Sequence, residues 1–103
     1  MAKPVFITTA AQNDLDNILF YLYENWGISV LENFLALYEA KISLIAEYPT
    51  RYPILHEESK LRKAVLTKHN IILYRVKTNN IEIISIFDTR QDPDKINSLN
   101  EEK

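Results

Sequence analysis

The sequence predicts an α+β fold of two layers, in which an antiparallel sheet packs on an α-helical hairpin. Two observations indicate this fold: two amphipathic helical segments follow each other across a single glycine, and three strand-like runs separated by asparagine-bearing turns come after them. A short strand precedes the helices. With 103 residues the chain has the length of one small domain. Residues 1–103 are expected to form that domain, with 91–103 as a C-terminal tail.

The first strand and the first helix can be placed from their composition and spacing. The run PVFIT, residues 4–8, is rich in β-branched and aromatic residues, which favours a short strand. Thr9 followed by Gln12 fits a capping box, which satisfies free amide groups at the start of a helix. Asp14 and Asp16 lie near that start, where their negative charge interacts favourably with the helix dipole. Apolar residues then recur at intervals of three and four: Leu15, Ile18, Leu19, Leu22 and Trp26.

The only glycine, Gly27, is expected to end this helix, because a left-handed C-terminal cap costs least there. Ser29 and Glu32 fit a second capping box, and Pro49 ends the second helix. So short a link forces the two helices to fold back as an antiparallel hairpin. The apolar face of the second helix consists of Leu31, Phe34, Leu35, Tyr38, Ile42 and Ile45.

The second half predicts a three-stranded meander after a polar loop at 49–60. The strands are residues 61–68, 71–77 and 81–88, joined by tight turns that contain asparagine. One face of the last two strands is assigned to the helices and carries Ile72, Tyr74, Val76, Ile81, Ile83 and Phe87. The opposite face carries Ile71, Leu73, Ile84 and Ile86, with Arg75 and Glu82 near the turn. This second face is also apolar, so the tail, a second subunit or another protein is expected to cover it.

The composition and the motifs limit the classes of function that are expected for this protein. A net charge of −2 and a pI of about 5.6 disfavour nucleic acid as the main partner, since phosphate binders carry an excess of Lys and Arg. The absence of cysteine, of a signal peptide and of an apolar run near the ~20 residues that span a bilayer predicts a cytoplasmic protein. His56 and His69 are too few for a metal site, and no hydrolase motif or glycine-rich phosphate loop is present, so no cofactor is expected. Trp26 and the tyrosines are expected in the core or the helix seam.

Three stretches in this order resemble the RelE/ParE superfamily of toxins from type II toxin–antitoxin pairs, and the ParE branch in particular. They are AQNDLDNILFYLYENWG in the first helix, IAEYPTRYP after the second, and LRKAVLTKHNIILYRVKTNNIEIISIFDTRQDP through the strands. The resemblance covers roughly residues 4–96. It implies the fold deduced above and an antitoxin whose segment wraps the toxin.

The superfamily has two activities, and the resemblance implies one of them. RelE-like members cut messenger RNA in the ribosome, which requires concentrated positive charge at the phosphodiester. Arg62 and Arg90 match two of that branch's basic positions, but Ile71 stands where an arginine would open the middle strand, and no Tyr or His follows Phe87. ParE-like members instead poison DNA gyrase without a nuclease site.

The resemblance therefore implies a ParE-like toxin that inhibits DNA gyrase, has no catalytic site of its own and is neutralised by a cognate antitoxin. The expected target-binding residues are Arg90, Gln91 and Arg62, and the expected antitoxin-binding residues are Leu73, Arg75, Ile84 and Ile86. A short, partly disordered antitoxin would lie across the hairpin and the second sheet face. Two alternatives stay open: a ribosome-dependent ribonuclease using Arg62 and Arg90, and a non-toxic antitoxin-binding module. Arg90 also has a structural alternative, an ion pair with Asp88 or Asp92.

Overall fold

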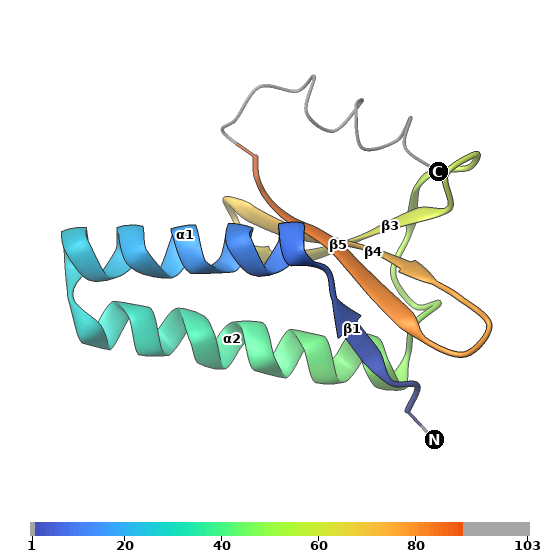
Figure 1. Ribbon diagram of the computed structural model, residues 1–103, viewed down its shortest axis with the longest axis horizontal. Helices are drawn as coiled ribbons and strands as arrows, with labels where there is room; N and C mark the ends of the chain where they lie inside the picture. The colour runs from blue at the N-terminus through green and yellow to red at the C-terminus, as the bar shows by residue number, and fades with distance from the viewer. Residues whose placement is uncertain (1, 90–103) are drawn as a thin grey trace.

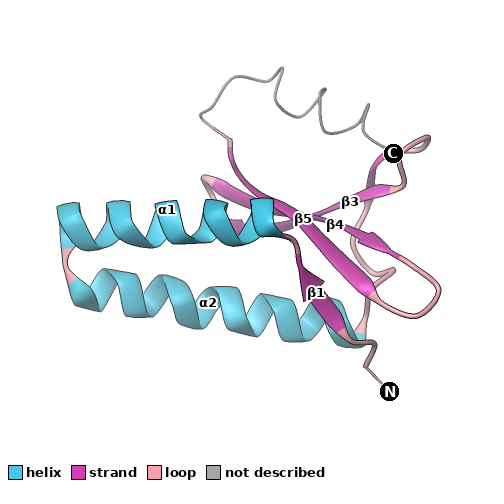
Figure 2. Cartoon of the chain, viewed as in Figure 1, coloured by secondary structure: helices cyan, strands magenta, loops and turns pink. Residues whose placement is uncertain are grey.

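In the computed structural model, which describes residues 2–89, a helical hairpin packs on one face of a five-stranded sheet (Figures 1 and 2). This arrangement confirms the predicted α+β fold and its order of strand, helices and strands. The sheet order is β1-β5-β4-β3-β2. The elements are β1 (Val5–Ile7), α1 (Thr9–Trp26), α2 (Ile28–Glu47), β2 (Ile54–His56), β3 (Leu61–Thr67), β4 (Asn70–Val76) and β5 (Ile81–Asp88).

The sheet differs from the prediction in two ways. It is mixed, because β1 pairs in parallel with β5, with Val5 opposite Ile81. It also has an additional edge strand, β2, which lies inside the segment 49–60 that was predicted to be a loop. β2 pairs with β3 over only a few residues, Ile54 being opposite Arg62. Three residues after a proline are too few to show a strand periodicity, so the pairing with β3 is what orders this segment.

Helix α1 begins one residue earlier than the predicted capping box. The N-cap is Thr8, whose side-chain oxygen accepts a hydrogen bond from the Ala11 amide at 3.1 Å, whereas Thr9 is already helical. The Thr8 hydroxyl also donates to the Ile83 carbonyl at 2.8 Å. The cap therefore joins the start of α1 to β5, a function that Thr9 does not serve.

A single glycine separates the two helices. Gly27 has φ 88° and ψ −178°, a conformation that side chains disfavour, and it caps α1 by donating its amide to the Tyr23 carbonyl at 3.0 Å. The same residue is the N-cap of α2, and no side chain caps that helix. The predicted capping box of Ser29 and Glu32 is therefore wrong, because α2 begins at Ile28 and Ser29 lies within it.

A β-bulge in β5 changes the predicted assignment of sheet faces. The register with β4 shifts between Leu73, which lies opposite Ser85, and Tyr74, which lies opposite Ile83, so Ile84 is the additional residue. Side chains after the bulge therefore exchange faces. Ile86 packs in the helix-side cluster and Phe87 in the cluster of the second face, the reverse of the prediction.

The core between the helices and the sheet is continuous, and a smaller cluster lies on the second sheet face. The second-face cluster is well buried, with Leu61 and Leu73 at 0% exposure. Within residues 2–89, neither helix has the length and apolarity needed to cross a membrane. The buried members of the helix-side core are Ala11, Leu15, Phe34, Tyr38, Ile45, Ala64, Leu66, Ile72, Tyr74, Ile81, Ile83 and Ile86.

Candidate partner-binding surface

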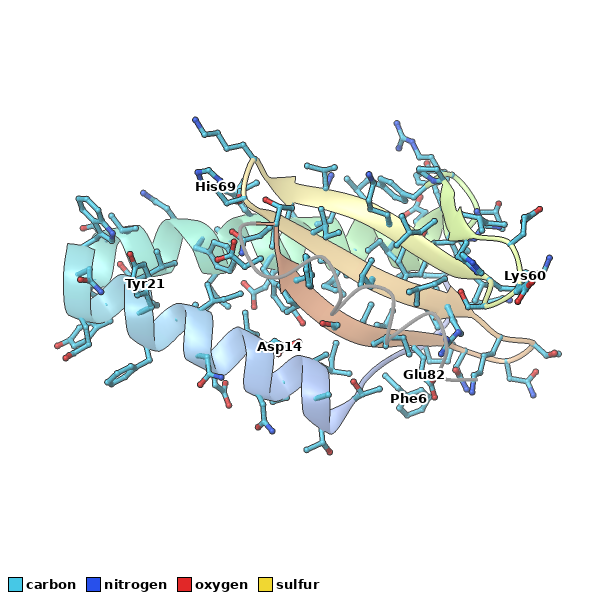
Figure 3. All side chains as sticks on the ribbon, turned by 90° about the horizontal axis from the view of Figure 1, so that it is seen from above. Phe6, Asp14, Tyr21, Lys60, His69 and Glu82 are labelled. Atoms are coloured by element: carbon cyan, nitrogen blue, oxygen red, sulfur yellow. The ribbon has the colours of Figure 1, made fainter. Side chains whose placement is uncertain are left out.

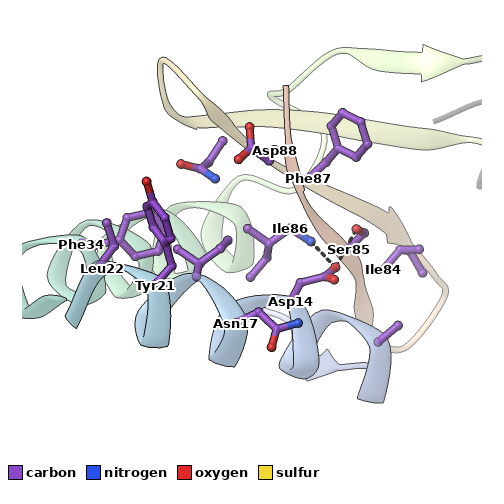
Figure 4. Close-up of a pocket in the computed structure, with 13 residues that line it drawn as sticks. Asp14, Asn17, Tyr21, Leu22, Phe34, Ile84, Ser85, Ile86, Phe87 and Asp88 are labelled. Atoms are coloured by element: carbon purple, nitrogen blue, oxygen red, sulfur yellow. Dashed lines mark hydrogen bonds between the residues drawn. The ribbon is translucent and has the colours of Figure 1, made fainter. Parts of the chain in front are cut away.

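A pocket of about 570 Å³ opens between α1 and β5 (Figure 4). It is formed by residues far apart in the sequence, mainly from α1 and the last half of β5, with one residue each from α2 and β4. The described residues that line it are Ala10, Asp14, Asn17, Ile18, Tyr21, Leu22, Phe34, Asn70, Ile84, Ser85, Ile86, Phe87 and Asp88.

The pocket lies where α1 replaces β1 as the neighbour of β5. β1 accompanies β5 only from Ile81 to Ile83. Beyond that point the Asp14 carboxylate of α1 accepts hydrogen bonds from the Ser85 hydroxyl at 2.8 Å and from the Ile86 amide at 3.1 Å (Figure 4). Asp14 thus satisfies a backbone donor at the bulge, in addition to any effect on the helix dipole. A helix lies farther from a strand than a second strand does, and this spacing leaves the pocket.

The pocket has apolar walls with acidic and amide groups beside them. Tyr21 lines it while remaining 53% exposed, so its ring is available to a partner. Asp14, Asn17, Asn70, Ser85 and Asp88 supply the polar groups, and the described lining residues include no Lys, Arg or His. Such a site suits an apolar side chain accompanied by a positive charge. Its described lining has no side-chain cation to stabilise the charge that develops at a phosphodiester during cleavage.

Arg62, predicted to contact the target, lies next to the segment that follows α2. Its guanidinium donates to the Tyr52 carbonyl at 2.7 Å and to the Thr50 carbonyl at 3.3 Å. Nearby, the buried Tyr74 hydroxyl donates to the Pro49 carbonyl at 2.7 Å. Burial raises the pKa of Tyr74 to about 12, although the positive charge of Arg62 lowers it. These two side chains hold the segment after α2 against β3 and β4.

The structure does not bring the four predicted antitoxin-binding residues to one exposed surface. Leu73 is fully buried in the second-face cluster, and Ile84 packs against that cluster while also lining the pocket. Ile86 belongs to the helix-side core and also lines the pocket. Arg75 donates from Nε to the Ser59 carbonyl at 2.8 Å. Arg90 and Gln91 lie outside the described residues.

Sequence reasoning missed the pocket and misplaced several aromatic residues. Trp26 is 66% exposed and Tyr23 is 52% exposed, so the prediction that they lie in the core or helix seam is wrong for both. Phe20, Tyr21 and Tyr23 fall outside the apolar stripe of the first helix, and this was the available signal that they face away from the core. Within residues 2–89, no group of three or more metal-binding side chains is close enough to hold a metal ion.

Comparisons with known proteins identify the family and agree with the fold. Residues 5–93 match the family model described as the ParE toxin of the type II toxin-antitoxin system parDE. A search of curated proteins finds no match. Among solved structures, the chromosomal ParDE toxin–antitoxin system from P. aeruginosa is similar in fold, with a TM-score of 0.66 and 18% identity over 84% of this chain and 96% of that one. Because the family model spans most of its length, the chain belongs to the ParE toxin family of type II toxin–antitoxin systems.

Proposed function

We propose that the protein is a toxin that acts by binding, that its target is DNA gyrase, and that a cognate antitoxin neutralises it. The observation that carries the proposal is the absence of cations among the described residues that line the α1–β5 pocket. Arg62 is one of the two basic side chains that the ribonuclease alternative requires. Its guanidinium already donates hydrogen bonds to the Tyr52 and Thr50 carbonyls. A pocket whose described lining carries apolar side chains and no cation supports action by binding rather than by nuclease chemistry.

The antitoxin is proposed to occupy the α1–β5 pocket. Tyr21 and Leu22 on one wall and Ile84 on the other can receive an apolar anchor from an amphipathic segment. The carboxylate of Asp14 favours a Lys or Arg next to that anchor. A short chain encoded beside this one, disordered alone and folding on the toxin, would fit this chemistry.

Purified protein, purified gyrase and plasmid DNA test the proposed target. The expected result is accumulation of cleaved DNA that is covalently attached to gyrase, suppressed when the antitoxin is added first. Translation arrest with codon-phased messenger RNA cuts, lost in Arg62→Ala or Arg90→Ala, would instead establish the ribonuclease alternative. Growth unaffected by the chain expressed alone would establish the non-toxic module.

Antitoxin binding can be tested with variants of exposed pocket residues, which are expected to fold. Tyr21→Ala removes a wall of the pocket and Asn17→Trp fills its opening, so each should weaken antitoxin binding by about tenfold or more, as for a central interface residue. Val65→Ala on β3, exposed but not a lining residue, is the matched control. Titration calorimetry with the neighbouring gene product measures the affinities. Equal affinities for all four proteins would place the antitoxin elsewhere.

A further inference from the structure

The far end of the helical hairpin carries exposed aromatic side chains that the pocket does not use. We define the tip surface as Phe20, Tyr23 and Trp26 at the end of α1 with Ile28 at the start of α2. These four side chains are 66%, 52%, 66% and 54% exposed. None of them lines the α1–β5 pocket. Several exposed large apolar side chains within nine residues of the chain are typical of a protein interface.

The tip surface projects beyond the sheet. The connection between α1 and α2 is the part of the hairpin farthest from the strands (Figure 1). Tyr21 lies near that connection, whereas Lys60 and Glu82 lie at the opposite end of the molecule (Figure 3). A partner can therefore approach the tip without contacting the sheet.

The charged residues nearest to the tip surface in the sequence are acidic. From Pro4 to Ala40 the chain has five carboxylates and no Lys, Arg or His, a local charge of −5 from five negative and no positive side chains. Two of them, Glu24 and Glu32, are exposed beside the tip surface and form no salt bridge with any part of the chain that the structure describes. The whole chain has a net charge of −2 and residues 4–40 have −5, so the rest of the chain has a net charge of +3.

We propose that the tip surface docks onto a positively charged protein surface, and that this surface belongs to the target that the toxin inhibits. The proposal rests on the binding mode proposed above and assigns the target to a different face from the antitoxin. Trp26 and Tyr23 are the residue types that most often anchor an interface. Glu24 and Glu32 then pair with basic groups around the anchors, which also steers the approach of the target.

The charge argues against the other occupants of an apolar tip. A second copy of this chain that docked tip to tip would bring its own Glu24 and Glu32 against the same acidic residues, and like charges oppose such a contact. Nucleic acids are polyanions and attract basic surfaces. Anionic membrane leaflets likewise attract Lys and Arg and repel carboxylates. A basic protein surface remains as the complementary partner.

Two variants separate the anchor from the charge. Trp26→Ala removes an exposed anchor, and the pair Glu24→Lys with Glu32→Lys reverses the charge. Each should reduce the affinity for gyrase by about tenfold or more, while antitoxin affinity stays within about twofold of wild type. The charge effect should shrink at high salt, because screening weakens exposed charges. Phe6→Ala, an exposed aromatic on β1 away from the tip, is the matched control and should bind gyrase normally.

Growth arrest gives a readout that does not depend on the identity of the target. Tip variants that no longer arrest growth, yet still co-elute with the antitoxin, support the proposal even if wild type leaves gyrase unaffected; in that case only the gyrase assignment fails. Tip variants that arrest growth and trap cleaved DNA like wild type overturn the tip proposal and leave the gyrase assignment intact. Two other outcomes also overturn the tip proposal. One is tip variants that lose only antitoxin binding, and the other is a wild-type dimer, seen by sedimentation, that Trp26→Ala dissociates. A wild-type chain that does not arrest growth contradicts both proposals.

Discussion

The two ends of the molecule use similar side chains in opposite ways. At the sheet, Ile83 and Tyr74 are fully buried, and the residues from Lys41 onward carry more positive than negative charge. At the hairpin tip, Ile28 and Tyr23 are more than half exposed, and the surrounding charge is negative. Apolar character is the same at both ends, but only the sheet provides a second layer to bury it. Stability therefore resides at the sheet end, while the tip remains available for a partner.

The largest difference between the two ends should appear in a pair of isoleucine variants. Ile83→Ala should destabilise the protein by about 2–5 kcal/mol, since it removes a fully buried side chain and leaves a cavity. Ile28→Ala, at an exposed position, should change the free energy of unfolding by less than about 0.5 kcal/mol. Urea denaturation measures both. Similar losses for the two variants would mean that the tip is buried in solution.

An intermediate effect is expected at the tip itself, where backbone conformation is the main constraint. Gly27→Ala should cost about 1–3 kcal/mol, because φ of 88° with ψ of −178° is a conformation in which a side chain is strained. Apart from the adjacent backbone, no atom lies within 4 Å of the position of an added Cβ, so crowding by other residues does not contribute. Ser29→Ala is the control and should be nearly neutral, because α2 has no side-chain cap. A large loss of stability in Ser29→Ala would instead mean that the Ser29 side chain does cap α2.

The smallest effect concerns pH at the sheet end. The pKa of Tyr74 is raised from 10.0 in the unfolded chain to about 12 in the fold, so its contribution to stability is complete below pH 10.0 and is lost as the pH rises to about 12. Tyr74→Phe should cost about 1 kcal/mol at neutral pH, through the lost bond to the Pro49 carbonyl, and should flatten the alkaline loss. Thermal melts from pH 8 to 12 measure this. Tyr23→Phe, at an exposed tip position, should behave like wild type.

The elements with strong local signals were predictable from the sequence. Gly27 ends α1 as expected, because only glycine adopts its conformation without strain. The N-cap was misplaced by one residue, since Thr8 and Thr9 can both cap and the hydrogen bond to Ile83 decides between them. β2 was missed because residues 54–56 have too little pattern to distinguish them from a loop.

Features that depend on distant residues could not be predicted. The β5 bulge at Ile84 lies in the run IEIISIF, where Glu82 and Ser85 are the only polar residues and the alternation is too short to reveal a change of face. The pocket requires Asp14 and Ser85, which are 71 residues apart, to meet. Trp26 continues the apolar spacing of its helix, but that spacing does not show where the sheet that covers the helix ends, and Trp26 is exposed. The candidate site therefore depends on tertiary geometry more than the fold class does.

The contact between Thr8 and Ile83 spans 75 residues and has a consequence for the order of folding. The helical hairpin can form from neighbouring residues while the chain is being synthesised, but β1 must wait for β5 to emerge before it has a pairing partner. Until then the inner faces of both helices lack their sheet. A nascent toxin would therefore expose its future core before it completes the α1–β5 pocket, and any protein that recognises that pocket can bind only the finished chain.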